Sequence, residues 1–140
     1  MSESKAPKPM GLYPNTKKAG GFLYMSGVGA RSMGSGSEEA NIPGLKYDKN
    51  GNYETFDFEA QCRSCFNNVK LILEEEGASL NDLVDVTVFL TDMKRDFRTY
   101  NKVYAEYFKD AKPCRTTVEV NSLPSPITIE LKCIAYLGDK

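Results

Sequence analysis

The sequence predicts an α+β fold in which two helices cover one face of a mixed sheet. Two segments, one after residue 57 and one after residue 92, carry apolar side chains at the three- and four-residue spacing of amphipathic helices. Short runs typical of strands stand before, between and after them. The resulting order is a strand, a short second strand, a helix, a strand, a helix and two strands. A chain of 140 residues suits one domain and buries about two-thirds of its unfolded surface.

The first part of the chain predicts a tail, a strand and a long loop. Residues 1–10 contain two prolines and indicate a flexible tail, which leaves 11–140 as the single domain. The apolar run 22–26 follows two glycines and predicts a strand. Residues 29–52 are polar and rich in glycine, so we expect a loop with a short strand near Lys46 that turns over 48–51. A loop of this length in a small domain is more often functional than not.

The first helix is expected to begin near Asp57 and to end at Gly77. Thr55 or Asp57 can accept a hydrogen bond from the first turn, and glycine suits the left-handed residue that ends a helix. The expected apolar face consists of Phe58, Cys62, Cys65, Phe66, Val69, Ile72 and Leu73.

The second half predicts a strand, a helix and two strands. The run 83–90 is rich in β-branched residues, and Asp92 can cap the helix that follows it. Residues 116–120 and 127–135 alternate between apolar and polar side chains, with a turn over 123–126 between them. The expected apolar face of the second helix consists of Phe97, Tyr100, Val103, Tyr104, Tyr107 and Phe108.

Two helices can cover only one face of such a sheet. The other face still carries apolar positions, which predicts that it is buried against other subunits. A closed cyclic homo-oligomer is the natural arrangement.

The composition excludes several classes of function. The chain has no histidine, so mechanisms that need an imidazole base are excluded and no metal site is expected. The net charge of −1 and the isoelectric point near 5.6 argue against a nucleic-acid partner. No apolar run approaches the roughly 18 residues of a membrane helix, and no secretory signal is visible, so we expect a cytoplasmic protein without a membrane partner.

The four cysteines are expected to be free thiols. Cys62 and Cys65 form a C-x-x-C pattern, but both lie on the apolar face of the expected helix and no second pair or histidine completes a zinc site. We interpret them as small buried side chains, with a redox role as the less favoured alternative.

Two charged residues are candidates for chemistry. Arg115 stands at the start of a strand, where its planar guanidinium suits a substrate carboxylate or, equally, an internal salt bridge. Glu130 lies in the middle of the most apolar strand. It is therefore either paired, or it borders a pocket where desolvation raises its pKa and suits it to acid–base work.

One set of residues along the chain consists of Tyr13, Ser26 and Gly27, the helix residues 60–61 and 68–69, residues 83–92 and 100–104, and the tail with Arg115 and 129–130. This set resembles the Rid/YjgF family of reactive-intermediate deaminases. The resemblance covers residues 11–136 and is strongest over 84–108 and in the tail formed by residues 115–120 and 129–135. It implies a chorismate-mutase-like fold and a homotrimer with three pockets between neighbouring subunits. It also implies hydrolysis of enamine or imine intermediates to a keto acid and ammonia, without metal or organic cofactor.

The resemblance implies a set of site residues. Arg115 matches the arginine that binds the substrate carboxylate, and Glu130 matches the acid that positions or activates water. Tyr13, Ser26 and Asn101 match positions that line the pocket. Active deaminases of the family often have a cysteine two residues after the arginine. This chain has Thr117 there, which leaves a backbone carbonyl to orient the water.

Residues 26–31 and 115–118 are similar to the 2-aminomuconate deaminase subgroup, whose substrate carries two carboxylates. Arg31 could bind the second carboxylate, and a solvated loop arginine is the alternative interpretation.

A different class of function is also open. The same pocket could bind a keto acid or another small metabolite without turnover, or the protein could act as a chaperone. Endoribonuclease activity has also been attached to the family, and the acidic isoelectric point makes it the poorest fit.

Overall fold

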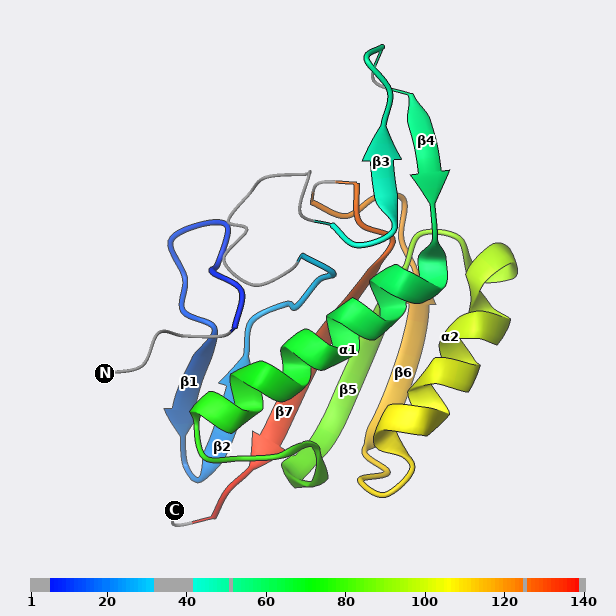
Figure 1. Ribbon diagram of the computed structural model, residues 1–140. Helices are drawn as coiled ribbons and strands as arrows, with labels where there is room; N and C mark the ends of the chain where they lie inside the picture. Colours follow the sequence, from blue (N-terminus) through cyan, green and yellow to red (C-terminus); the bar gives the residue numbers. More distant parts are fainter. Residues whose placement is uncertain (1–5, 32–41, 51, 125, 139–140) are drawn as a thin grey trace.

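The computed structural model describes residues 6–31, 42–50, 52–124 and 126–138. Figure 1 shows its elements. In chain order they are β1 (Thr16–Ala19), β2 (Phe22–Met25), β3 (Leu45–Tyr47), β4 (Tyr53–Phe56), α1 (Phe58–Glu75), the short 3-10 helix η2 (Leu80–Asp82), β5 (Leu83–Leu90), α2 (Met93–Phe108), β6 (Cys114–Glu119) and β7 (Ile129–Tyr136).

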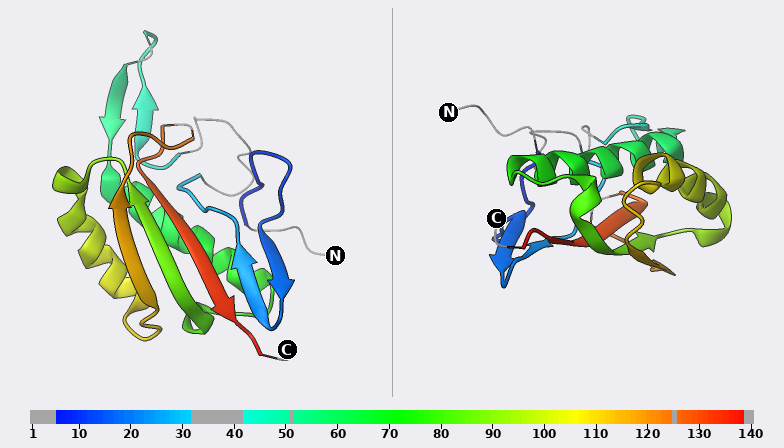
Figure 2. Two further views of the ribbon diagram at one scale, coloured as in Figure 1. Left: turned by 180° about the vertical axis from the view of Figure 1, so that it is seen from behind. Right: turned by 90° about the horizontal axis from the view of Figure 1, so that it is seen from below.

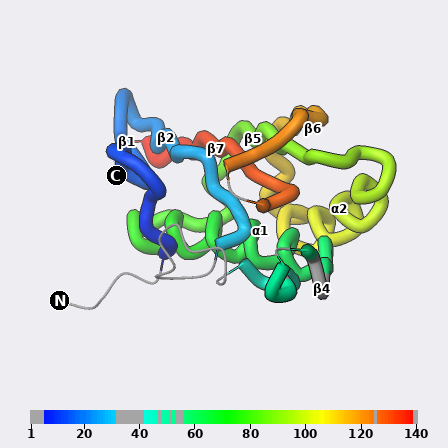
Figure 3. Tube along the Cα trace, turned by 90° about the horizontal axis from the view of Figure 1, so that it is seen from above, coloured from blue at the N-terminus to red at the C-terminus, as the bar shows by residue number. Residues whose placement is uncertain are grey.

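Five of the strands form one mixed sheet in the order β1-β2-β7-β5-β6. Only β5 and β6 run parallel, and α2 supplies the crossover that a parallel pair requires. Both helices lie on the same side of the sheet, as the views from below and from above show (Figures 2 and 3). The predicted α+β class, with two helices on one face of a mixed sheet, is therefore confirmed.

Helix α1 forms as its sequence predicts. The Asp57 side chain accepts a hydrogen bond from the backbone N–H of Ala60 at 3.2 Å and caps the first turn. Gly77 follows the last turn with a φ of 74°, the left-handed conformation that favours glycine. All seven residues of the expected apolar face are buried against the sheet or α2.

Helix α2 begins after Asp92, whose side chain accepts a hydrogen bond from Arg95 N at 3.0 Å. Most of its expected apolar face is buried or partly buried, but Phe97 is 39% exposed and its ring makes an edge-to-face contact with that of Tyr100. Phe66 of α1 meets this face through edge-to-face contacts with Tyr100, Tyr104, Tyr107 and Phe108. These aromatic contacts join the two helices into one layer.

The structure adds two strands that the sequence analysis did not predict and moves two strand boundaries. Strand β1 pairs with β2 in a hairpin, and β4 pairs with β3 in a second hairpin that extends away from the body (Figure 1). Strand β6 begins at Cys114 rather than at 116, and β7 begins at Ile129 rather than at 127. The predicted strand near Lys46 is β3, which lies in the two-stranded sheet and not in the main one. The other predicted elements follow one another along the chain as expected.

Part of the expected N-terminal tail packs on the domain. Residues 1–5 lie outside the described residues, whereas Ala6 is buried with the main core. Asn15 donates a hydrogen bond from its amide to the carbonyl of Pro7 at 3.0 Å. The boundary between a tail over 1–10 and a domain over 11–140 stays a prediction.

The face of the sheet opposite the helices is apolar and uncovered in the single chain. We call it the open sheet face. Alternation along β7 buries Leu131 and Cys133 toward the helices and turns Ile134 to the other side. Strand register places the following apolar side chains on the open sheet face: Phe22, Tyr24, Phe89, Val118, Ile134 and Tyr136. Several of them are well exposed, so the predicted uncovered apolar face is present.

Candidate functional site

The first group of candidate residues lies where β6 meets α2. The Arg115 guanidinium donates a hydrogen bond from Nη1 to Asn101 Oδ1 at 2.9 Å. Its central carbon lies 4.7 Å from the ring centroid of Tyr104 and 5.2 Å from that of Tyr100. Thr117, two residues further along β6, shares a 2.8 Å hydrogen bond with the Tyr100 hydroxyl. The structure therefore brings Arg115, Asn101 and Thr117 together.

The contacts of Arg115 leave it suited to an anionic ligand. In the described part of the chain it contacts an amide oxygen and two aromatic rings, and no carboxylate forms a salt bridge with it. Burial raises the pKa of Tyr104 to about 12, so this ring stays a neutral phenol beside the cation. An exposed guanidinium held in a fixed orientation can bind a carboxylate through two parallel hydrogen bonds.

The second group lies where β2 ends beside β7. Ser26 donates a hydrogen bond from its hydroxyl to the Pro14 carbonyl at 2.6 Å, and its backbone N–H donates to Asn15 O at 2.9 Å. The Ser26 hydroxyl thus ties the segment around Tyr13 to the end of β2. The Tyr13 side chain is 43% exposed.

Glu130 belongs to this second group and points to the open sheet face. Val28 and Leu131 exchange backbone hydrogen bonds of 2.8 and 2.9 Å, which places Gly27 beside Glu130. A methyl group on Gly27 would lie only 2.9 Å from Glu130 Oε2, so glycine leaves the room that the carboxylate occupies. Burial raises the pKa of Glu130, and the positive charge of Arg31 lowers it in part.

Arg31 is a buried residue of this group. It is 7% exposed, which rules out the alternative of a solvated loop arginine. Together with Lys8, Tyr13 and Gly27 it lines a small pocket of about 40 Å³. Two cations therefore border one pocket close to Glu130.

A single chain does not bring the two groups together. Arg115 pairs with Val86, a residue of β5 that is buried toward the helices. Glu130 is the register partner of Phe89, three residues further along β5, on the open sheet face. Because the two side chains leave opposite faces of the sheet, they cannot act on one substrate within one chain.

Three of the four cysteines have the character expected of core residues. Cys62, Cys65 and Cys133 are buried, and Cys114 is exposed at the start of β6. Burial raises the pKa of Cys62 and of Cys133 to about 12 and raises the pKa of Cys65 well above its ordinary value. A thiol with a raised pKa is a poor nucleophile at neutral pH, which disfavours a redox role for the C-x-x-C pair.

The sequence analysis assigned no site role to three polar residues on the buried side of α1. Gln61 is fully buried and accepts hydrogen bonds at Oε1 from the backbone N–H and the hydroxyl of Thr128, at 3.0 and 3.1 Å. Ser64 and Asn68 donate to the backbone of the segment that follows β2. Their three- and four-residue spacing, in step with the apolar face, is the signal that identifies them.

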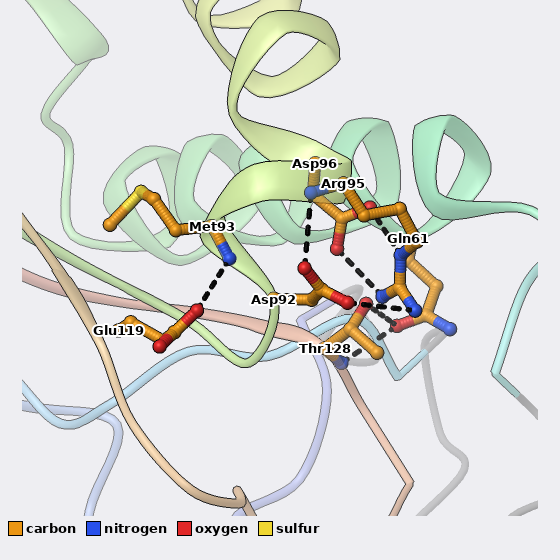
Figure 4. A network of polar contacts seen from close by, with 7 residues as sticks. All are labelled: Gln61, Asp92, Met93, Arg95, Asp96, Glu119 and Thr128. Carbon is orange, nitrogen blue, oxygen red and sulfur yellow. Dashed lines mark hydrogen bonds and ion pairs between the residues drawn. The ribbon is translucent and has the colours of Figure 1, made fainter.

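Gln61 also lies near a polar network around the first turn of α2 (Figure 4). There Asp96 is 2% exposed and receives two 2.8 Å hydrogen bonds from the guanidinium of Arg95. Glu119 of β6 accepts a hydrogen bond from Met93 N at 2.8 Å. The Glu119 contact joins the start of α2 to the sheet, and so it helps to position the helix that carries Asn101.

The described residues contain no group of three or more cysteine, aspartate or glutamate side chains arranged to hold a metal ion. No helix in the described ranges has the length and the apolar composition that a membrane span requires.

Comparison with known proteins gives consistent matches over nearly the whole chain. A family model described as Endoribonuclease L-PSP matches residues 3–137. A RutC family protein of Pyrococcus horikoshii is 44% identical over 131 residues, which cover 94% of this chain and 91% of that protein. Reactive Intermediate Deaminase A of Arabidopsis thaliana, a chloroplastic protein, is 34% identical over 137 residues, which cover 98% of this chain and 65% of that protein.

Solved structures agree with the fold. The crystal structure of E. coli TdcF with bound serine superposes with a TM-score of 0.78 at 30% identity and covers 96% of this chain and 95% of that one. The chain belongs to the Endoribonuclease L-PSP family, which is the Rid/YjgF family that its sequence resembles.

Proposed function

We propose that this protein is an enamine and imine deaminase that hydrolyses a reactive intermediate derived from an amino acid to a keto acid and ammonia. The observation that carries the proposal is Arg115, an exposed guanidinium held by Asn101 and two tyrosine rings and suited to a carboxylate. A relative named Reactive Intermediate Deaminase A supports the reaction class. The serine bound to TdcF, itself an amino acid with a carboxylate, supports a ligand of this kind.

The proposed reaction needs orientation and proton transfer. Arg115 holds the carboxylate while the enamine tautomerises to the imine. Water held by Glu130 and a backbone carbonyl near Arg115 adds its oxygen to the imine carbon, while Glu130 takes one water proton and passes it to the imine nitrogen. The hydroxyl of the resulting carbinolamine then gives its proton to the amino group as the C=O bond forms, and the C–N bond breaks to release ammonia. General acid–base help of this kind contributes about 10²–10⁴-fold. The imine carbon is already electrophilic, so a site with few groups suffices.

The proposed active unit is a homotrimer with its pockets between subunits. Arg115 and Glu130 leave opposite faces of one sheet, so a complete site requires Arg115 from one copy and Glu130 from the next. Covering the open sheet face with other copies would also bury its exposed aromatic side chains, among them Tyr24 and Tyr136.

The proposed substrate is a dicarboxylic enamine such as 2-aminomuconate. Arg31 and Lys8 border the pocket beside Glu130, and Arg31 binds the second carboxylate. Arg31→Ala should therefore lower kcat/KM for 2-aminomuconate by at least tenfold more than for 2-aminoacrylate, which has one carboxylate. Equal losses on the two substrates would remove Arg31 from substrate recognition.

The function is tested by ammonia release from freshly generated 2-aminoacrylate and 2-aminomuconate. We expect turnover by the wild-type protein and a loss of at least 10²-fold in Arg115→Ala, because the substrate carboxylate is no longer oriented. Light scattering should show the same assembly for both proteins. If neither substrate reacts faster than with Arg115→Ala, the protein binds keto acids or other small metabolites without turning them over.

A further inference from the structure

The segment that follows β2 is fixed to α1 through four consecutive backbone carbonyls. Cys65 donates from Sγ to Val28 O at 3.2 Å, and Ser64 donates from its hydroxyl to Ala30 O at 2.8 Å. The amide of Asn68 donates to Gly29 O at 3.0 Å and also to the carbonyl of Arg31. All three donors lie on one face of α1, so the helix and this segment form one unit.

These contacts lie in the interior, where a hydrogen bond constrains the position of the backbone segment most strongly. Asn68 is 3% exposed, and Ala30 and Arg31 are buried as well. A buried carbonyl that loses its donor bears a desolvation cost, so the segment has no equally good alternative position. Dense packing adds to this, because a methyl group on Gly29 would lie 2.6 Å from Ile127 Cδ1.

The same segment carries two groups that act on the Glu130 carboxylate. Gly27 leaves the space that the carboxylate occupies, and the charge of Arg31 acts on its ionisation. Arg31 directly follows Ala30, whose carbonyl accepts the hydrogen bond from Ser64, and the carbonyl of Arg31 itself accepts one from Asn68.

We propose that Asn68 is a positioning residue which, with the help of Ser64, holds the segment 27–31 so that Arg31 stays beside Glu130. Asn68 touches no substrate. It acts through the backbone that places Arg31 and Gly27. The inference deepens the deaminase function proposed above and rests on it for its catalytic consequence.

Other charged or titratable groups near Glu130 are independent of this contact. Lys132 lies on the same face of β7 and donates its ammonium to the carbonyl of Met25, which precedes the segment. Lys8 and Tyr13 line the adjoining pocket, and the residue that β5 places opposite Glu130 is a phenylalanine. A change at Asn68 should therefore reach Glu130 through the segment that carries Arg31.

The test is a carbon-13 NMR titration of the Glu130 side-chain carboxyl in the full protein, assigned by the loss of its signal in Glu130→Gln. In Asn68→Ala, Arg31 is held less closely, so the measured pKa should rise by about half to one pH unit. Ser64→Ala should shift it in the same direction by less. Asn67→Ala, at the neighbouring exposed position of α1, and Ser64→Thr, which keeps the hydroxyl donor, should titrate like the wild type.

Ammonia release from the same samples separates this inference from the function itself. We expect kcat in Asn68→Ala to fall about tenfold or more, since small displacements in an active site are costly. If the wild type releases no ammonia but the titration shifts, the deaminase function fails and the positioning role stands. If Asn68→Ala and Ser64→Ala both titrate like the wild type, the positioning role is wrong. Should Asn68→Ala fail to fold, the pair Ser64→Ala and Ser64→Thr decides alone.

Discussion

At the scale of single residues, the candidate site combines an arginine, whose charge is permanent, with a glutamate, whose charge depends on pH. Arg115 presents an exposed guanidinium, a permanently charged group. Glu130 is partly buried in a strand whose other side packs into the core, and this burial raises its pKa despite the opposing effect of Arg31. The pH dependence of the protein should therefore report on Glu130.

The first prediction concerns that pH dependence. If the carboxylate of Glu130 activates water, only its deprotonated form works, so kcat/KM should fall as the pH is lowered through the pKa of Glu130. Burial raises this pKa, so the fall should begin at a higher pH than the ordinary glutamate value of 4.5 would give. Initial rates of ammonia release across the pH range, corrected for spontaneous hydrolysis, provide the measurement. In Glu130→Gln the residual rate should lack this step, and an unchanged profile in that variant would contradict the assignment.

The sequence identifies some residues of the site and hides others for a physical reason. Arg115 and Glu130 are visible because a charge at the start or in the middle of an apolar strand needs a partner or a pocket. The burial of Arg31 depends on how residues distant in sequence surround it, which no local pattern contains. Asn68 and Ser64 can be placed on the buried side of a helix, but the carbonyls that they hold depend on tertiary structure.

At the scale of elements, the hydrophobic periodicity of the sequence predicts the helices and strands that bury a continuous apolar face. It misses the strands that bury no such face. Helix α1 and strand β5 each bury such a face, and both were expected. Strand β1 has the sequence Thr-Lys-Lys-Ala and lies at the edge of the sheet, where one neighbour and little burial suffice. Its hairpin is signalled only by Gly20 and Gly21, which both have positive φ.

The second prediction tests the start of α1. Asp57→Ala removes the acceptor that satisfies Ala60 N, so the free energy of unfolding should fall by about 1 kcal/mol. Urea denaturation measures the change, with all proteins at one concentration because an oligomer's stability depends on it. Asp57→Ser retains a capping oxygen and should recover most of the loss. Equal stability of the alanine variant and the wild type would show that the cap contributes nothing.

At the scale of the whole molecule, the sheet separates the Arg115 group from Glu130, and the proposed homotrimer has to bring these two halves of the site together. The Arg115 group belongs to the layer between sheet and helices, and Glu130 belongs to the open sheet face. Each half is ordered within one chain, so association completes the site without having to build either half.

The third prediction tests whether each site takes Arg115 from one subunit and Glu130 from another. Arg115→Ala and Glu130→Ala should each be inactive, but subunits of the two variants, mixed and reassembled, should regain activity. Some interfaces then join an intact Arg115 to an intact Glu130. Random mixing in equal amounts into closed trimers gives about a quarter of the wild-type sites. Ammonia release before and after subunit exchange provides the measurement. No recovery after confirmed exchange would place both residues of each site in one subunit.

The central place of β7 affects how this protein is made. Strand β7 pairs with β2 on one side and β5 on the other, yet it follows both in the sequence. While the chain is still on the ribosome, the β1–β2 hairpin and the β5–β6 pair have no strand to join them. Both present unpaired edges until residues 129–136 emerge. Closure of the sheet therefore follows translation of β7. The long-range β2–β7 pairing makes closure a slow step, during which the unpaired strand edges are open to aggregation.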